Sequence, residues 1–248
     1  MSNQWASRCK FGVLGPSTNT VVEPDFHAIT PQGVSNHYAR IFTEDAKALS
    51  NDSFTAGTDV ISQNLMDAVD SVMTCSPDYL VMGMSAITFY GGLEGAKRFE
   101  NRIKQRSGLG CSAGSIACDA ALQAYGGVRK IAFLSPYYPI ANSEVRRFFG
   151  DCGYDVVRDL CLECKSWTDI SRVEEDQLRA ALYDLDGDDI DALIQVGTNL
   201  SMMRLASEME ALLAKPVIAI NAATYWHALR ANGLPDQITG FGQLLAAH

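Results

Sequence analysis

Two short apolar runs of this sequence, at 79–82 and 192–196, are each followed by a turn that begins with glycine and contains hydroxyl or amide side chains. Each run is typical of a strand buried in a parallel sheet, and ligands of such sheets bind beyond the carboxyl ends of the strands. The residues that follow the runs are Gly83, Met84 and Ser85 in the first turn, and Gly197, Thr198 and Asn199 in the second. Backbone amides and hydroxyls at two such turns could together hold an anion. We therefore expect a site that these turns face from two sides.

Two further turns carry similar residues. The predicted strand at 11–14 leads into G-P-S-T-N-T, which contains Asn19 and can offer backbone and side-chain donors to an anion. It is not a P-loop, because the G-K-[ST] ending is absent. The other turn, S-P-Y-Y-P at 135–139, contains Tyr137. Taken alone, Asn19 is typical of a turn or a helix cap, and Tyr137 is equally typical of a packed aromatic residue.

Composition and charge narrow the class of protein. The 248 residues are 47% hydrophobic and 20% charged, which is ordinary for a globular enzyme of one large domain or two modest ones. The net charge of −9 argues against nucleic acid as the main partner, because phosphate binding needs a basic face. No apolar run predicts a membrane span, and the polar N-terminus lacks the apolar core of a signal peptide. We expect a cytoplasmic protein.

The seven cysteines are an odd number scattered along the chain, so a disulfide framework is not expected. Cys161 and Cys164 form a C-x-x-C, but a single pair without a second pair or a nearby histidine is weak support for zinc or redox chemistry. We interpret most of the cysteines as small buried hydrophobic residues.

Predicted strands and helices alternate along the whole chain, which indicates an α/β fold with parallel sheets. The alternation runs through one half of the chain and then starts again, so we predict two lobes. The first spans 1–126 and is joined by the C-terminal helix, at about 224–248, and the second spans 127–223. The segment 23–32 contains two prolines and is expected to form a loop over the site. The cleft between the lobes is the expected site.

Four motifs resemble the aspartate/glutamate racemase superfamily, and within it the branch of arylmalonate decarboxylase and maleate cis-trans isomerase. In chain order they are V-L-G-P-S-T-N-T at 13–20, M-G-M-S-A-I-T-F-Y-G-G at 82–92, S-P-Y at 135–137 and G-T-N-L at 197–200. The resemblance covers essentially the whole chain. It implies two pseudosymmetric Rossmann-like lobes, no cofactor, no metal, and a small carboxylate or dicarboxylate substrate. Related proteins are monomers, dimers or larger, so a homo-oligomer stays open.

The resemblance also shows where catalytic cysteines would be placed. Racemases and isomerases of this superfamily carry one cysteine on each lobe, and the decarboxylase keeps only the second. By position these sites fall on Gly83 and Gly197, or on Met84 and Val196 if the register shifts by one. Neither register supplies a thiol. Racemisation by two bases and isomerisation by addition of a thiolate therefore lack their reagent.

What remains by similarity is a dioxyanion hole, a set of donors that holds one carboxylate. The catalytic hydroxyls would be those of Ser85 and Tyr137, and the substrate-binding residues would be Asn19, Gly83, Met84, Gly197, Thr198 and Asn199. Preorganised donors of this kind can supply roughly 3–4 kcal/mol each. We expect a cofactor-independent lyase that resembles arylmalonate decarboxylase but has no catalytic cysteine.

Several alternatives stay open. One is a maleate isomerase-like or racemase-like enzyme with an acid or base other than cysteine, and His37, near the mouth of the site by similarity, could be that acid. Another is a different lyase, or a hydrolase, that uses the same donors. A third is a relative that binds a carboxylate without turnover. Cys111 closes a predicted strand that points towards the cleft, but by resemblance the residue at this place is often non-catalytic, so a structural role is favoured.

Overall fold

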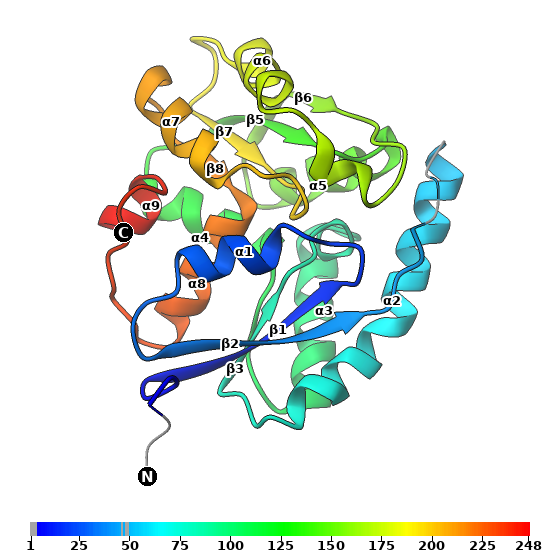
Figure 1. The fold of residues 1–248 in the computed structure, drawn as a ribbon. Helices are drawn as coiled ribbons and strands as arrows, with labels where there is room; N and C mark the ends of the chain where they lie inside the picture. Colours follow the sequence, from blue (N-terminus) through cyan, green and yellow to red (C-terminus); the bar gives the residue numbers. More distant parts are fainter. Residues whose placement is uncertain (1–3, 46, 48–49) are drawn as a thin grey trace.

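The computed structural model describes residues 4–45, 47 and 50–248, and within them the chain forms two four-stranded sheets whose strands are all parallel (Figure 1). The first sheet has the order β2-β1-β3-β4, from β1 (Cys9–Pro16), β2 (Val34–Ile41), β3 (Tyr79–Met82) and β4 (Cys111–Ser112). The second has the order β6-β5-β7-β8, from β5 (Lys130–Ser135), β6 (Asp155–Cys161), β7 (Ala192–Gln195) and β8 (Val217–Ala219). The predicted α/β fold with two parallel-sheet lobes is confirmed.

Helices link the strands, because parallel neighbours can be joined only by a crossover connection. Those of the first lobe are α1 (Val22–Ala28), α2 (Asn51–Met73), α3 (Gly92–Ser107) and α4 (Gly114–Tyr125), with the 3-10 turn η1 (Ala86–Thr88) after β3. Those of the second lobe are α5 (Pro139–Asp151), α6 (Glu175–Leu185) and α7 (Met203–Leu213), with the 3-10 turn η2 (Asp169–Arg172) before α6. In the described part of the chain, no helix has the length and apolar character needed to cross a bilayer.

The last long helix returns to the first lobe. α8 (Ile220–Ala231) packs on α1, α4, β3 and β4, and Figure 1 shows its orange ribbon beside the blue α1. The short α9 (Gln243–Ala247) contacts α4 and α8. This path agrees with a C-terminal helix that joins the N-terminal lobe, and the proposed boundaries of the lobes stay a prediction.

The strand register brings the expected turns together within each sheet. In the first sheet Leu14 lies opposite Met82, and the Gly83 amide continues the ladder by donating to the Leu14 carbonyl at 2.7 Å. In the second sheet the Val196 amide donates to the Leu134 carbonyl at 3.0 Å. The loops after β1 and β3, and those after β5 and β7, therefore leave each sheet side by side.

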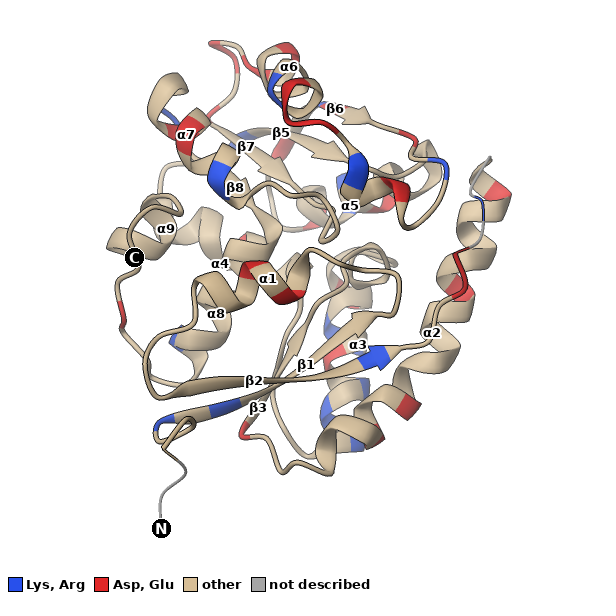
Figure 2. Cartoon of the chain, viewed as in Figure 1, with Lys and Arg blue, Asp and Glu red and all other residues tan. Residues whose placement is uncertain are grey.

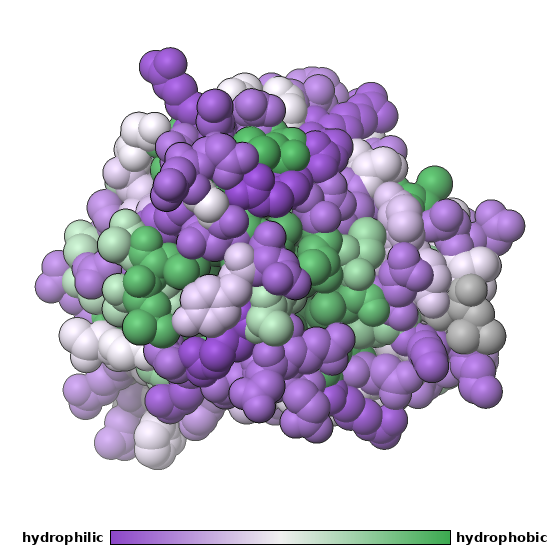
Figure 3. Space-filling view, turned by 90° about the horizontal axis from the view of Figure 1, so that it is seen from above, coloured by the Kyte–Doolittle hydropathy of each residue, from purple (hydrophilic) through white to green (hydrophobic). Residues whose placement is uncertain are grey.

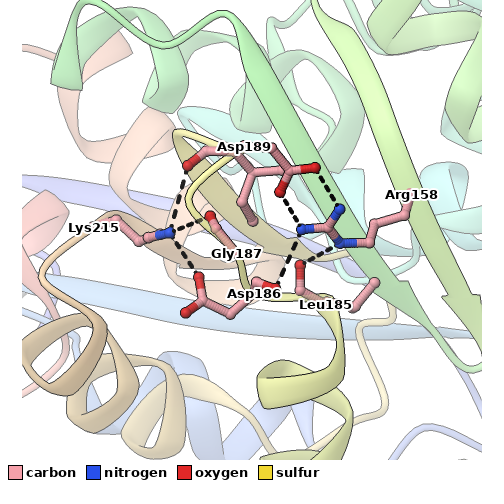
Figure 4. A network of polar contacts seen from close by, with 7 residues as sticks. Arg158, Leu185, Asp186, Gly187, Asp189 and Lys215 are labelled. Atoms are coloured by element: carbon pink, nitrogen blue, oxygen red, sulfur yellow. Dashed lines mark hydrogen bonds and ion pairs between the residues drawn. The ribbon is translucent and has the colours of Figure 1, made fainter.

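Polar contacts fix the segment that leads into β7, at the end of the second sheet away from these turns (Figure 4). Arg158 of β6 donates to both carboxylate oxygens of Asp189, at 2.8 and 2.6 Å. These hydrogen bonds lower the pKa of Asp189 to about 2. Lys215 donates to the Gly187 carbonyl at 2.9 Å and pairs with Asp186 at 2.7 Å. The segment before β7 is thus held by β6 and by the segment that leads into β8.

Two expectations about elements need correction. The segment 23–32 is not a loop throughout, because its first half lies in α1, with Pro24 in the first turn. A proline is tolerated there since the first N–H groups of a helix have no helical partner. The apolar spacing of the sequence predicts a helix at 59–73, but α2 begins earlier, at Asn51, and Ser50 starts it by forming a capping box with Ser53.

Candidate active site

A cavity of about 40 Å³ lies between the lobes, beyond the carboxyl ends of β1, β3, β5 and β7. Its polar lining residues are Thr18, Asn19, Thr58, Ser85, Tyr137, Thr198 and Asn199. Its other lining residues are Pro16, Ile61, Met84, Ala86, Pro136, Trp167, Ile170 and Gly197. Every predicted site residue except Gly83 therefore lines this cavity. Their catalytic and binding roles stay predictions.

Ser85 and Tyr137 meet across the two lobes. Their hydroxyl oxygens are 2.5 Å apart, and both side chains are buried. The Tyr137 hydroxyl also donates to the Val196 carbonyl at 2.8 Å, and the Thr198 amide donates to Ser85 Oγ at 3.3 Å. Since a carbonyl can only accept, the phenol proton is directed to Val196 and Ser85 donates to Tyr137. A ligand oxygen could take the place of either internal acceptor.

Asn19 connects the loop after β1 with the second lobe. Its Nδ2 donates to Thr198 Oγ1 at 3.2 Å, and its Oδ1 accepts from the amides of Val21 and Val22 at 2.9 and 3.0 Å. The oxygen thus satisfies free N–H groups where α1 starts, while the amide nitrogen keeps a second hydrogen beyond the one given to Thr198. Asn19 therefore caps the start of α1 and also lines the cavity, and its contact with a substrate stays a prediction.

Asn199 fixes two loops around the cavity with its side chain. Its Oδ1 accepts from the Thr20 amide at 3.0 Å, and its Nδ2 donates to the Trp167 carbonyl at 2.9 Å. The side-chain amide is therefore engaged with protein groups. The Asn199 Nδ2 keeps a second hydrogen, as that of Asn19 does, so a substrate contact could come from the side chain or from the backbone amide.

The two glycines at the expected cysteine positions have no room for a side chain. A Cβ added to Gly197 would lie 2.4 Å from Pro136 Cδ, and one added to Gly83 would lie 2.8 Å from Val22 Cγ1. The Gly83 amide is also occupied by the sheet, as described above. In the first lobe, Met84 and Ser85 are the residues of this turn that line the cavity.

The cavity lining is uncharged among the described residues. Figure 2 shows the acidic and basic residues along the helices, loops and strands of both lobes, including acidic residues on α1. Burial raises the pKa of the Tyr137 phenol, so the hydroxyl stays protonated and can donate. An anion in this cavity would be held by neutral donors, whose hydrogen bonds are strengthened by the low local dielectric.

A buried carboxyl lies behind the turn that carries Thr198. Asn221 of α8 donates through Nδ2 to Asp25 of α1 at 2.7 Å and to the Thr198 carbonyl at 3.0 Å. Burial raises the pKa of Asp25 to about 6, against the opposite effects of the Asn221 hydrogen bond and of Arg204. The helices α1 and α8 thereby position the turn whose Thr198 amide donates to Ser85.

None of the cysteines lines the cavity within the described residues, and all seven are free thiols. Cys111 pairs with Leu80 in the sheet and so lies at the level where β3 begins, away from the turn at Ser85. Burial raises the pKa of Cys161 to about 12 and that of Cys164 to about 11. In residues 4–45, 47 and 50–248, no group of three or more His, Cys, Asp or Glu side chains could hold a metal ion.

His37, a candidate acid from the sequence, lies outside the cavity lining, and so does His227. His37 hydrogen-bonds Ser35 at 2.9 Å, and His227 hydrogen-bonds Ser112 of β4 at 2.7 Å. Arg40 supports the site indirectly, because it donates to the Asn19 carbonyl at 2.7 Å.

One wall of the cavity is formed by α2 and by the segment around η2, and no sequence motif indicates it. Thr58 and Ile61 come from α2, and Trp167 and Ile170 come from the segment before and within η2. The spacing in α2 marks Ile61 as a buried residue, but no local signal distinguishes a cavity wall from ordinary core. Trp167 carries no motif that would have singled it out.

Comparison with known proteins finds relatives that match nearly the whole chain. Residues 12–245 match the model of a family described as arylmalonate decarboxylase. A maleate isomerase of Nocardia farcinica is 21% identical over 242 residues, which cover 95% of each chain. A maleate isomerase of Pseudomonas putida is 22% identical over 250 residues, which cover 96% of this chain and 97% of that protein.

Solved structures with the same fold include a Nocardia farcinica maleate cis-trans isomerase bound to TRIS, with a TM-score of 0.85 and 21% identity. That match covers 96% of this chain and 97% of the other. An arylmalonate decarboxylase structure has a TM-score of 0.74 and 19% identity, covering 95% of this chain and 98% of the other.

Proposed function

Because the chain belongs to the arylmalonate decarboxylase family, we propose that it is a cofactor-independent lyase that decarboxylates a small carboxylate or dicarboxylate without a catalytic cysteine. The observation that carries this proposal is the meeting of Ser85, Tyr137 and the Thr198 amide in one buried cavity without a thiol. Donors fixed in this way stabilise charge that develops on a carboxylate, at roughly 3–4 kcal/mol for each well-placed donor.

Decarboxylation would use both the polar and the apolar residues that line this cavity. The donors bind the carboxylate that is retained, while the departing carboxylate is desolvated against apolar residues such as Ile61, Ala86 and Ile170. The bond between the α-carbon and the departing carboxylate breaks, its electron pair moves into the retained carboxylate as an enediolate, and carbon dioxide leaves. This step needs no thiolate.

A proton must then reach the α-carbon. We assign this transfer to Tyr137. Its single O–H proton leaves the hydrogen bond to the retained carboxylate and moves to the α-carbon, and solvent water then reprotonates the phenolate, leaving hydroxide that the released carbon dioxide takes up as bicarbonate. Burial keeps the phenol protonated by raising its pKa, and an enediolate carbon is basic enough to accept that proton. The phenolate formed would be stabilised by the Ser85 hydroxyl, 2.5 Å away.

The size of the cavity favours a short substrate. The cavity has a volume of about 40 Å³ and is lined on one side by Ile61, Trp167 and Ile170. A phenyl substituent would require the wall formed by Trp167, Ile170 and Ile61 to move outwards. We therefore expect methylmalonate to be a better substrate than phenylmalonate.

A maleate isomerase-like activity is the second candidate, because the two curated relatives described above are maleate isomerases. It would need a nucleophile or a pair of acids and bases that replaces cysteine. A relative that binds a carboxylate without turnover is the third.

The test is to incubate the purified protein with malonate, methylmalonate, phenylmalonate, maleate and aspartate. Released carbon dioxide, proton NMR spectra and optical rotation distinguish the reactions. We expect carbon dioxide from a malonate only. Fumarate from maleate would replace the lyase with the isomerase, and saturable binding of these acids without any turnover would support the binding protein.

Ser85→Ala and Tyr137→Phe should each lower kcat/KM for the malonate by about 10²–10³-fold, the loss expected for one oxyanion donor. The exposed residues Ser71 and Tyr183 offer matched controls, since Ser71→Ala and Tyr183→Phe remove the same atoms away from the cavity. Full activity in both site variants would show that these hydroxyls do not stabilise the transition state.

A further inference from the structure

The loop after β7 contains a β-turn whose two central N–H groups point to one side. The turn runs from Gly197 to Leu200, because the Leu200 amide donates to the Gly197 carbonyl at 3.1 Å. Neither of the central residues, Thr198 and Asn199, has a positive φ. A hydrogen-bonded turn with negative φ at both central positions is of type I, and its central N–H groups point the same way, as they do in the first turn of a helix.

These N–H groups face the cavity. The Thr198 amide donates to Ser85 Oγ at 3.3 Å, and Ser85 lines the cavity. The Asn199 amide points to the same side, Asn199 also lines the cavity, and no described residue accepts from this amide. A free N–H next to one that already contacts Ser85 is placed to donate to a carboxylate oxygen bound at this turn.

Asn221 of α8 holds the other side of the same peptide. The Thr198 carbonyl and the Asn199 N–H belong to one peptide unit, and they point in opposite directions because the peptide is trans. Asn221 Nδ2 donates to this carbonyl at 3.0 Å and to Asp25 at 2.7 Å. Since a carbonyl can only accept, the nitrogen of the Asn221 amide must face it. The Asn221 side chain is buried, so the contact is shielded from water.

The turn needs such a restraint because Asn199 tolerates an alternative conformation. A type II turn differs from a type I turn by a rotation of the central peptide through roughly 180°, and it requires a positive φ at the third residue. Asparagine adopts a positive φ more readily than most residues. The rotation would turn the Asn199 N–H away from the cavity and bring the Thr198 carbonyl, an acceptor, towards a bound carboxylate.

We propose that Asn221 is a positioning residue, which keeps the turn 197–200 in its type I form so that the Asn199 N–H donates to the carboxylate that the substrate retains. This inference rests on the proposed function. Asn221 is not among the residues that line the cavity, so it acts through the Thr198 carbonyl. The retained carboxylate gains negative charge as the enediolate forms, and the donor therefore stabilises the transition state more than the ground state.

Asn221→Ala removes both of the amide hydrogens without changing the cavity lining. We expect this variant to lower kcat for methylmalonate by about 10²-fold, the loss typical of one oxyanion donor, with a much smaller change in KM. Asn36→Ala is the matched control, because Asn36 also binds α8, by accepting from Tyr225 at 3.1 Å, but forms no hydrogen bond with the turn among the described residues. It should lose stability and keep its kcat. Equal kcat in the two folded variants would overturn the proposal.

Backbone ¹⁵N–¹H spectra give a readout that does not depend on turnover. Saturation of the wild-type protein with methylmalonate should move the Asn199 amide signal downfield, because this N–H gains an acceptor. Gly83 offers an internal control, since its amide lies beside the site but already donates to the Leu14 carbonyl, and its signal should stay in place. In Asn221→Ala the Asn199 signal should not move. A wild-type Asn199 signal that is unchanged at saturation, or one that moves equally in Asn221→Ala, would overturn the proposal.

The two measurements also separate this inference from the function on which it rests. If carbon dioxide is released from methylmalonate while the Asn199 signal stays unchanged, only the role of Asn221 is wrong. If methylmalonate moves the Asn199 signal in the wild type alone and no carbon dioxide is released, the lyase function is wrong and the turn still binds a carboxylate under the control of Asn221. If malonate, methylmalonate and maleate all fail to bind, both are wrong.

Discussion

Gly197 occupies a position where the superfamily resemblance would place a cysteine, and its surroundings explain why a side chain is absent. The ring of Pro136 lies where a Cβ would project, with Cδ 2.4 Å from the added atom. Proline has little freedom to move aside. At Gly83 the nearest atom belongs to the side chain of Val22, which can rotate, so the constraint there is weaker. The packing of two neighbouring turns therefore requires a residue without a side chain at Gly197.

Gly197→Ala should lower the free energy of unfolding by about 1–3 kcal/mol, as overpacking in a buried site does. Urea denaturation measures the change. Gly150→Ala is the matched control, because Gly150 lies in α5 with open space around its Cβ position, and alanine favours a helix by up to about 1 kcal/mol. Equal stability of the two variants would contradict the close contact with Pro136.

At the scale of elements, α1 and α8 support the turn that carries Thr198. Asn221 joins the Asp25 carboxylate to the Thr198 carbonyl through one amide nitrogen. The arrangement places a carboxyl that is costly to ionise next to the site, because burial is the main cause of its raised pKa. The stability of this region should consequently depend on pH.

The pKa of Asp25 is raised to about 6 in the folded protein, above its value in the unfolded chain, so the folded state binds this proton more tightly. The resulting stabilisation is complete below about pH 4 and is lost as the pH rises through about 6. Asp25→Asn keeps an acceptor for Asn221 and removes the ionisation. We expect the variant to be more stable than the wild type at pH 8, by up to about 3 kcal/mol, and to gain nothing at pH 4. Thermal unfolding between pH 4 and pH 8 tests this, and parallel curves for the two proteins would refute it.

At the scale of the whole molecule, the geometry of the cavity depends on how the two lobes pack, because Ser85 belongs to the first lobe and Tyr137 to the second. Beyond the cavity, the second lobe also caps a helix of the first. Glu144 of α5 accepts from the Gly91 amide at 2.7 Å, and Asp151 accepts from the Leu93 amide at 3.1 Å, both where α3 starts. Carboxylates at a helix N-terminus satisfy free N–H groups and the helix dipole.

Asp151→Ala should therefore destabilise the protein by about 1 kcal/mol, the usual effect of a lost cap. Glu94→Ala is the control, because Glu94 also lies in the first turn of α3 but pairs with Lys97 on the same helix rather than bridging the lobes. Urea denaturation compares the two. A smaller loss for Asp151→Ala than for Glu94→Ala would show that the contact between the lobes does not contribute.

One face of the molecule gives no support for a particular partner. On the face seen in Figure 3, hydrophobic residues form separate groups among hydrophilic ones. Large contiguous apolar patches are what usually mark protein interfaces. A homo-oligomer therefore stays a prediction.

The sequence by itself determined the alternation of strands and helices, the parallel sheets, and the turns that carry the site, because each of these depends on local patterns of apolar, glycine and hydroxyl residues. It did not determine that α1 forms across Pro24, since the cap from Asn19 depends on the folded loop. Nor did it indicate Trp167, which reaches the cavity only because Gly57 and Asn199, distant in sequence, hold it there.

Only the tertiary structure decided which residues of each turn face the cavity. In the first turn the Gly83 amide is used by the sheet and the side chain of Met84 lines the cavity, a distinction that depends on strand register. The hydrogen bond between Ser85 and Tyr137 likewise depends on how two lobes pack, and contacts between residues 52 positions apart leave no local pattern in a sequence.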